Sequence, residues 1–296
     1  MTASDLSDAL EGRREGHEWR CRCPVHGGRS LCVTEKNGRI LLMCRAGCSQ
    51  GEVISELKRL GLWGSVTRYE DQPPAPTPQD NTELRANKAS EIWDQAHPIE
   101  TGDPVHTYLK NRGIIFPKHQ SDLKTHPALP YWEMGEDEKP IKIGVFPCML
   151  AIVRNPQGKP VGLHRTYITS DGHKAPVMAP KKLFKVYDLS GSSVRLFSPQ
   201  NGLLAVTEGI EDALSAMILW QIPAWAVLGT SGMKGFIPPE NVQEVMILSD
   251  NDESGRRSAL ELAQRLENKG KAVRIRVPSG HTKDINQILW RGQDES

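Results

Sequence analysis

The sequence predicts an α/β protein in which a small cysteine-rich module precedes an α+β region and a C-terminal parallel sheet. Three observations predict this class. Five of the six cysteines lie between Cys21 and Cys48, a proline-rich stretch follows, and from residue 203 onward apolar runs alternate with amphipathic segments. Apolar strands separated by helices are typical of a parallel sheet covered on both faces. We expect a module at 1–64, a proline-rich linker at 65–82, an α+β region at 83–200 and the sheet domain at 201–296.

Length and composition limit the class further. The chain has 296 residues, of which 38% are hydrophobic and 25% charged, as expected for a soluble globular protein of about two domains with a small extra module. No apolar run approaches the roughly 18 residues that a membrane-spanning helix needs. Residues 1–18 are polar and acidic, which argues against a secretory signal. We therefore expect a cytoplasmic protein with no membrane partner.

Two short-spaced pairs of metal-ligand residues lie in the N-terminal module. Two residues separate Cys23 from His26, and three separate Cys44 from Cys48. Between the pairs, segments 31–34 and 39–43 flank an Asn-Gly dipeptide and predict a hairpin, and a helix is expected over 52–60. Two ligand pairs on two turns suit a four-coordinate structural zinc site.

The two remaining cysteines of the cluster, Cys21 and Cys32, are surplus to this site. Cys21 is an alternative ligand to Cys23, although the spacing from Cys23 to His26 is the commoner one. Free or buried thiols are the alternative for the whole cluster, and disulfides are disfavoured in a chain without a secretory signal. A module of this size is expected to need its metal in order to fold.

Acidic and polar residues follow three strands of the expected C-terminal sheet. Strands are expected at 203–207, 224–228, 245–249 and 273–277, and helices at 210–220, 254–268 and 284–290. Glu208 follows the first strand, Asp250 and Asp252 follow the third, and Lys283, Asp284 and Asn286 follow the last. Because ligands of such sheets bind at the carboxyl ends of the strands, we expect Glu208, Asp250 and Asp252 in one crevice.

The chemistry of this acidic group points to a divalent cation. Three close carboxylates repel one another unless cations lie among them. Oxygen ligands favour Mg²⁺ or Mn²⁺ over zinc, and such a site suits phosphoryl transfer. Asp212 is a further candidate, with stabilisation of a helix N-terminus as its alternative role. Ordinary turn chemistry and incidental surface acids are the alternatives for the group as a whole.

Charge along the chain is segregated, although its sum is only +1. Residues 105–200 carry 14 basic and 7 acidic side chains, whereas residues 201–296 carry 10 and 13. The sum argues against a highly basic nucleic-acid coat protein or an acidic tail protein, but the asymmetry favours a polyanionic partner, with a solvated surface as the alternative.

Most candidate phosphate contacts lie in the basic middle region. Helices are expected at 83–96 and 105–111, and strands at 147–154 and 161–169 around a turn. The cations expected to neutralise phosphates are Arg165, Lys174, Lys181, Lys182 and Lys185. Tyr167, beside Arg165, can stack on a base. A solvated face is the alternative for each of these cations, and His164 is expected to be structural.

The order of these motifs resembles two known modules. Strand–Glu208-Gly209, strand–Asp250-x-Asp252 and Lys283-Asp284-x-Asn286 resemble the toprim domain, which has a Rossmann-like parallel sheet. Cys23-Pro-x-His26 and Cys44-x-Ala-Gly-Cys48 resemble the zinc-binding module of bacterial, phage and plasmid primases. The combination is similar to the bacterial-type (DnaG-like) primase in the compact form found on mobile elements.

The resemblance implies synthesis of short RNA primers on a single-stranded DNA template from ribonucleoside triphosphates. It implies that Glu208 is a general base or metal ligand and that Asp250 and Asp252 are a metal-binding pair. It also implies that Lys283, Asp284 and Asn286 contact the nucleotide. The Cys44–Cys48 pair is one residue wider than in chromosomal primases, and Gly27-Gly28 stands where an acidic residue often follows the zinc histidine. No helicase segment follows residue 296, so a separate replicative helicase is expected as a partner.

Three other functions are compatible with parts of the pattern. A non-catalytic DNA-binding mediator of replication or recombination can also combine a zinc module with toprim, but it would tolerate loss of the acids. A toprim nuclease would degrade DNA rather than join nucleotides. A topoisomerase is disfavoured, because none of the five tyrosines lies in a suitable additional domain.

Overall fold

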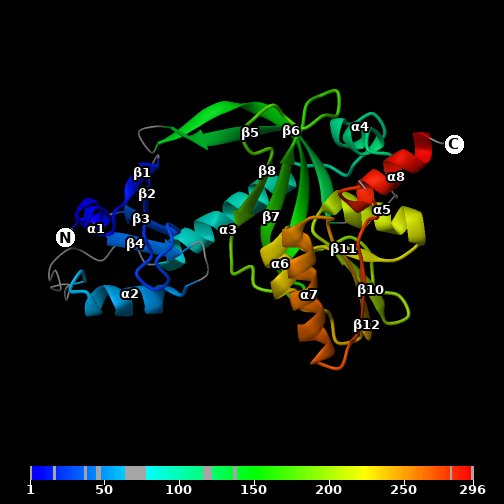
Figure 1. Cartoon of the computed structure of the whole chain (residues 1–296). Coiled ribbons are helices and arrows are strands. Elements are labelled where there is room, and N and C mark those ends of the chain that lie inside the picture. Colours follow the sequence, from blue (N-terminus) through cyan, green and yellow to red (C-terminus); the bar gives the residue numbers. More distant parts are fainter. Residues whose placement is uncertain are drawn as a thin grey trace. The chain divides into compact units, whose positions relative to one another are not determined.

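The computed structural model describes residues 2–15, 18–36, 39–44, 48–63, 78–115, 122–135, 139–280 and 282–294 (Figure 1). The chain divides into two compact units, residues 1–75 and 76–296. Each unit has its own hydrophobic core, so the two are described separately.

The first unit is a four-stranded antiparallel sheet in the order β1-β2-β3-β4. Its elements are α1 (Ala3–Ala9), β1 (Arg13–Glu15), β2 (Glu18–Cys21), β3 (Leu31–Lys36), β4 (Arg39–Cys44) and α2 (Gln50–Arg59). The strands β3 and β4 confirm the predicted hairpin, whose Asn-Gly turn lies outside the described residues. Ser49 and Glu52 form a reciprocal capping box at the start of α2, which confirms the predicted helix. Leu6 of α1 and Leu57 of α2 are fully buried in this core.

The expected linker lies mostly outside the described residues, which resume at Pro78. Helix α3 (Pro78–Asp94) begins there, so residues 78–82 of that expected linker are helical. Proline is tolerated in the first turn of a helix, because the backbone N–H that it lacks has no partner there.

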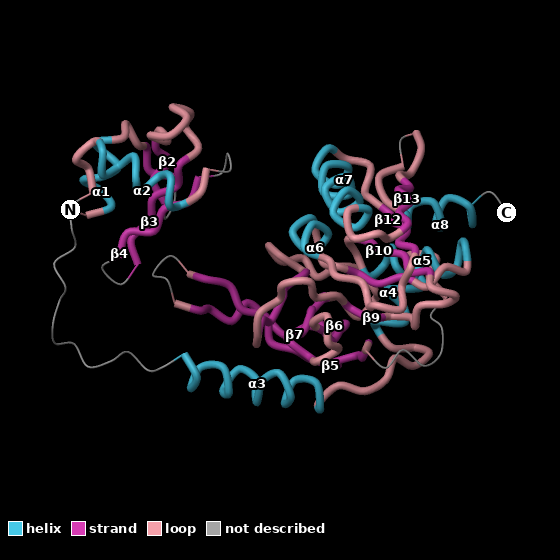
Figure 2. Tube along the Cα trace, turned by 90° about the horizontal axis from the view of Figure 1, so that it is seen from below, coloured by secondary structure: helices cyan, strands magenta, loops and turns pink. Residues whose placement is uncertain are grey.

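The second unit begins with an antiparallel sheet in the order β5-β6-β7-β8, and α3 lies along it (Figure 2). Its elements after α3 are α4 (Pro104–Lys110), β5 (Leu123–Met134), β6 (Pro140–Arg154), β7 (Pro160–Tyr167) and β8 (Lys181–Lys185). The predicted strands at 147–154 and 161–169 are confirmed as β6 and β7, although β6 begins seven residues earlier. Ile92 of α3 packs with Tyr131 and Leu150 of the sheet.

The remainder of the second unit is a five-stranded sheet in the order β13-β12-β10-β11-β9. The elements are β9 (Val194–Arg195), β10 (Leu203–Thr207), α5 (Ile210–Trp220), β11 (Ala224–Ala226), α6 (Thr230–Gly235), β12 (Glu244–Leu248), α7 (Glu253–Glu267), β13 (Ala272–Arg276) and α8 (Ile285–Asp294). Four strands are parallel, and β9 pairs antiparallel with β11. The predicted α/β class with a C-terminal parallel sheet is therefore confirmed.

Alternate residues of strand β10 point into two different cores. Leu204 and Val206 pack with residues of α6 and α7, whereas Ala205 packs with residues of α5 and α8. This alternation buries both faces of the sheet and explains why its strands are apolar throughout. The carboxyl ends of β10 and β12 therefore lie side by side at one edge. In the part of the chain that the structure describes, no helix is both long enough and apolar enough to cross a membrane.

Candidate metal centres

The four predicted zinc ligands come together in the first unit. The ligand atoms of Cys23, His26, Cys44 and Cys48 all lie within 4.8 Å of one another. Cys23 and His26 belong to the loop after β2, Cys44 ends β4, and Cys48 precedes α2. The Sγ atoms of Cys23 and Cys48 are 3.9 Å apart, and Nε2 of His26 is 3.3 Å from Sγ of Cys44. Three sulfurs and one imidazole form a donor set that suits tetrahedral zinc.

The electrostatics of this group also fit a bound cation. The pKa of Cys48 is raised to about 11, first by burial and then by the adjacent thiols of Cys44 and Cys23. Thiols that suppress one another's ionisation in this way are ionised by a divalent metal, because thiolates are its ligands. The geometry therefore supports zinc binding, which stays a prediction until an ion is measured.

The surplus cysteines lie outside the ligand group. Cys21 is fully buried in the module core, and burial raises the pKa of its thiol. Cys32 is 3% exposed, and its Sγ lies 3.4 Å from Oε1 of Glu18. The structure thus places Cys23, and not Cys21, beside His26.

The predicted acidic residues Glu208, Asp250 and Asp252 lie at the carboxyl edge of the second unit's parallel sheet. Glu208 directly follows β10, and Asp250 follows the adjacent strand β12. Asp252 is the N-cap of α7, where its Oδ1 accepts hydrogen bonds from the backbone N of Gly255 (2.8 Å) and Oγ of Ser254 (3.0 Å). Strand order alone brings these three residues to one edge.

The pKa values of the three acids are shifted by burial, by one another and by hydrogen bonds. Burial raises the pKa of Glu208 to about 7, with contributions from Asp250 and Asp252 and an opposing one from Lys283. Burial also raises the pKa of Asp250, with support from Asp284 and Asp252. Hydrogen bonds lower the pKa of Asp252, beginning with the one from Gly255. Lys283 opposes the rise at Glu208, and Lys283 and Lys181 oppose it at Asp250.

An unpartnered oxygen shows that this group can accept a cation. Oε1 of Glu208 is buried and has no hydrogen-bond partner among the described residues. A buried oxygen without a partner is costly, and Mg²⁺ or Mn²⁺ prefers such oxygen ligands. The residues present therefore fit a divalent cation. Among the described residues, no carboxylates are gathered as tightly as the Cys/His ligands of the first unit.

Asp212 lies one helical turn after Glu208 and belongs to the same environment. Burial raises the pKa of Asp212 to about 8, and the charge of Asp284 is the second cause of this rise. Its Oδ1 accepts a hydrogen bond from the backbone N of Asn286 (2.9 Å). A Cβ atom on Gly209 would lie 2.8 Å from Oδ2 of Asp212, so a larger residue would displace this carboxylate. The Glu-Gly dipeptide therefore makes room for a second acid.

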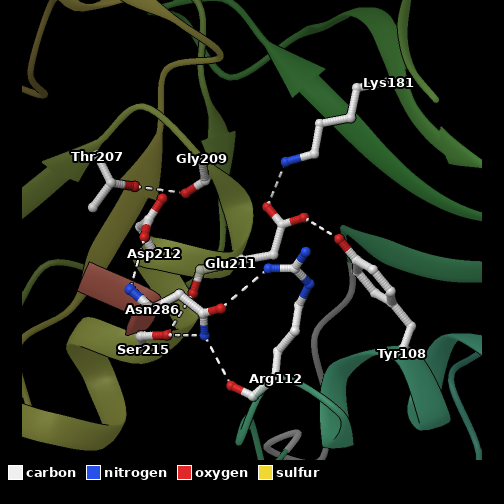
Figure 3. Close-up of polar contacts among 9 residues, drawn as sticks. All are labelled: Tyr108, Arg112, Lys181, Thr207, Gly209, Glu211, Asp212, Ser215 and Asn286. Atoms are coloured by element: carbon white, nitrogen blue, oxygen red, sulfur yellow. Dashed lines mark hydrogen bonds and ion pairs between the residues drawn. The ribbon is translucent and has the colours of Figure 1, made fainter. Parts of the chain in front are cut away.

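Asn286 joins three elements of the second unit (Figure 3). Its side-chain amide donates to the carbonyl of Arg112 (2.9 Å) and to Oγ of Ser215 (3.0 Å), and its Oδ1 accepts from Arg112 (3.2 Å). Asn286 is 6% exposed. These contacts give Asn286 a structural role, whereas the predicted contact with a nucleotide stays a prediction.

Glu211 is the centre of a buried junction that the sequence did not reveal (Figure 3). It lies on α5 and is 4% exposed. Its Oε1 accepts from the hydroxyl of Tyr108 on α4 (2.6 Å), and its Oε2 accepts from Nζ of Lys181 on β8 (2.9 Å). Burial alone would raise the pKa of Glu211, but Lys181 and the hydrogen bond from Tyr108 outweigh burial and hold it below its usual range. Glu211 is thus ionised at neutral pH.

Replacing Glu211 by Gln is expected to destabilise the second unit by about 1–3 kcal/mol, because charged hydrogen bonds within a buried junction are lost. A carboxylate whose pKa is lowered by folding stabilises the fold above its unfolded pKa, and this stability is lost as the pH falls through the folded value. The difference between parent and variant should therefore shrink in acid. Urea unfolding at pH 7 and pH 4 measures this change. Glu253→Gln, an exposed acid in the first turn of α7, is the matched control, and equal effects of both variants would contradict the prediction.

The predicted basic residues of the second unit have different contact partners. Nζ of Lys181 donates to the carboxylate of Glu211. Burial lowers the pKa of Lys174, and repulsion by the charge of Lys181 is the second cause. The guanidinium of Arg165 lies 5.4 Å from the Phe184 ring centroid, and Nζ of Lys182 lies 3.9 Å from that of Tyr131. Arg165 and Lys182 thus contact aromatic rings and Lys181 pairs with Glu211. The phosphate-binding role expected for these cations and Lys283 stays a prediction.

His164 is buried, whereas Lys185 is exposed. His164 is 8% exposed. Burial lowers its pKa to about 4, and the charge of Lys181 is the second cause of this decrease. A neutral buried imidazole agrees with the structural role expected for it. Lys185 is exposed at the end of β8.

Two family models match the chain. Residues 83–196 match a domain of unknown function (DUF7146), and residues 203–294 match the toprim domain. No curated protein matches the chain.

Several solved structures are similar to the chain at low identity. The primase fragment of the bacteriophage T7 primase-helicase protein is 22% identical over 51% of this chain and 60% of that one, with a TM-score of 0.39. The zinc-binding and RNA polymerase domains of Aquifex aeolicus primase are 15% identical over 100% of this chain and 81% of that one, with a TM-score of 0.45. The RNA polymerase domain of Mycobacterium tuberculosis primase DnaG is 15% identical over 74% of this chain and 82% of that one, with a TM-score of 0.45. The chain spans less than two thirds of the T7 fragment.

Proposed function

Because residues 203–294 form a toprim domain, we propose that the protein is a DNA-directed RNA primase of the DnaG-like kind. It joins ribonucleoside triphosphates into short RNA primers on single-stranded DNA, and a separate helicase opens the duplex. The observation that carries this proposal is the acidic group at the ends of β10 and β12, in which a buried oxygen of Glu208 has no described partner.

In this proposal Glu208, Asp250 and Asp252 hold Mg²⁺ or Mn²⁺. The chemistry that such an ion supplies when bound is neutralisation of phosphate charge and activation of an attacking hydroxyl. The alternative role of Glu208 is that of a general base: without the ion its pKa is raised to about 7, so it can accept a proton near neutral pH, whereas a bound cation favours its ionised form. Its Oε1 atom is buried and has no hydrogen-bond partner among the described residues.

The basic side chains of the second unit position the substrates in this proposal. Lys283 lowers the pKa of Glu208 and Asp250 and therefore lies within electrostatic reach of phosphates that the cation held by these acids would bind. Arg165, Lys174, Lys181 and Lys182 neutralise template or nucleotide phosphates. In this proposal the Cys/His module of the first unit contacts the template.

A primer-synthesis assay tests the proposal directly. The full chain is incubated with the four ribonucleoside triphosphates, Mg²⁺ and single-stranded DNA of mixed sequence, and the products are separated on a denaturing gel. Short RNAs are expected with the parent and not with Glu208→Gln. Removal of the nucleotides or the template should abolish the product, since both are substrates.

The same experiment separates the alternatives. Shortening of a labelled DNA template without RNA synthesis would indicate a toprim nuclease. DNA binding that survives Asp250→Asn together with Asp252→Asn, and no synthesis by the parent on any template, would indicate a non-catalytic mediator. Either result overturns the proposed function.

A further inference from the structure

A cavity of about 390 Å³ lies within the second unit beside the acidic group. Its walls come from α4, the loop after β7 and α8, and they include Tyr108, Arg112, Lys174, Asp284 and Trp290. This volume lies in the range of about 300–1,000 Å³ that small-molecule sites occupy. Two of its wall residues, Asp284 and Asn286, also interact with Asp212 near Glu208.

The charge of the cavity wall favours an anion. Arg112 and Lys174 line it, and Asp284 is the acidic side chain among the described lining residues. Burial lowers the pKa of Lys174, and the neighbouring cations Lys181 and Arg112 lower it further. Cations that repel one another at a concave site are stabilised when a phosphate group lies between them.

Arg112, one of the two cations of this wall, is held in place. The guanidinium carbon of Arg112 lies 4.9 Å from the ring centroid of Tyr108, and its Nη1 donates to Oδ1 of Asn286 (3.2 Å) (Figure 3). Stacking on one aromatic ring and one hydrogen bond fix the position of the group. A fixed guanidinium suits recognition of a phosphate better than a mobile one.

The loop that carries Lys174 is also fixed by close packing. Gly172 has a φ of +78°, and a Cβ atom there would lie 2.7 Å from the backbone N of Tyr108. The amide of Asn111 donates to the carbonyls of Asp171 (3.1 Å) and Gly172 (3.2 Å). The loop therefore lies tightly on α4 and presents Lys174 to the cavity without rearrangement.

The aromatic wall residue contributed by α8 is Trp290, which is 51% exposed. We propose that this cavity is a mononucleotide-binding site, in which Trp290 stacks on the nucleobase and Arg112 and Lys174 bind the phosphates. Stacking of a base on an aromatic ring tolerates any base. The inference rests on the proposed function in one respect, which is the identification of the bound anion as a nucleotide.

Binding measured without divalent metal tests this site apart from catalysis. The full-length protein is titrated with ATP in EDTA, and its affinity is measured by calorimetry. Trp290→Ala is expected to weaken ATP binding by about tenfold, since one base–aromatic stack is lost. Trp132→Ala is the matched control, because Trp132 is 47% exposed and does not line the cavity. Lys174→Gln should weaken ATP more than adenosine, whereas Lys269→Gln, on an exposed helix end, should change neither.

Three results would overturn the inference. The first is no ATP binding by the parent in EDTA, and the second is an equal loss of ATP affinity in Trp290→Ala and Trp132→Ala. The third is a Trp290→Ala variant that binds ATP as the parent does but no longer binds a DNA oligonucleotide. The last result would assign the surface to template rather than to a mononucleotide. Primer synthesis by the parent without this ATP binding removes only the inference. ATP binding that depends on Trp290 in a protein that makes no primers removes only the proposed function.

Discussion

Replacing Glu208 by Gln or Asp250 by Asn is expected to reduce primer synthesis by roughly 10³-fold, since each change removes a ligand of the divalent cation that the proposed reaction needs. The same variants are expected to be more stable than the parent when metal is absent. Burial and neighbouring carboxylates raise the pKa of both acids, so each charge opposes folding in the metal-free protein.

The pH dependence of that stability has a definite sign. The pKa of Glu208 rises from the model-compound value of 4.5 to about 7 on folding. Its contribution to stability is fully present below pH 4.5 and is lost as the pH rises through about 7. The metal-free parent should therefore lose stability over this range, and Glu208→Gln should lose less.

Thermal unfolding in EDTA and in Mg²⁺, measured across this pH range, checks both effects. Mg²⁺ should stabilise the parent, because it binds the folded state, and should stabilise the two variants less. Glu267→Gln, an exposed acid at the end of α7, is the matched control. Variants that are less stable than the parent in EDTA, or that keep full synthesis, would contradict the assignment.

Removing zinc is expected to unfold the first unit while leaving the second folded. Its core is small, and in modules of this size metal binding contributes on the order of 10 kcal/mol of folding free energy. Cys44→Ser removes one of the four gathered ligands. We expect this variant to retain less than one zinc per chain and to lose the β3–β4 hairpin.

Zinc content by elemental analysis and protease cleavage within residues 1–63 measure this loss on the full chain. Cys32→Ser is the matched control, because Cys32 is as buried as a ligand but lies outside the ligand group. Full zinc content in the Cys44→Ser variant, or cleavage that begins in the second unit, would show that the four residues do not form the site.

Elements with strong periodicity or clear caps were predictable from the sequence. Helix α5 (Ile210–Trp220) has its expected bounds, and α2 begins at the capping box of Ser49 and Glu52. Elements without such signals were missed. Strand β9 has two residues, and β5 contains Pro127 and Pro130 and a register shift between His126 and Leu129, which break a regular alternation.

Some features of the candidate site could likewise be predicted from the sequence, and others could not. The rule that ligands bind at the carboxyl ends of parallel strands led to the prediction that Glu208 and Asp250 share one crevice. The adjacency of their strands, β10 and β12, is a finding of the structure that the sequence did not predict. The partners of Glu211 were not predictable, since Tyr108 is 103 positions away in sequence and no local pattern marks it. The same holds for Arg112, which meets Asn286 from 174 positions away. Such contacts follow from tertiary packing, which a single sequence does not encode locally.

Strand β9 has a consequence for how this chain can be divided and recombined. Although it precedes the region that matches the toprim domain, β9 pairs with β11 and completes that domain's sheet. Arg195 of β9 lies 4.5 Å from the ring centroid of Trp225 and donates to the carbonyls of Asn155 and Pro156. A fragment that starts at residue 203 would expose β11 as a bare edge, open to pairing with another chain. Grafting or exchange of the toprim-matching region between proteins should therefore carry residues 193–196 along with it.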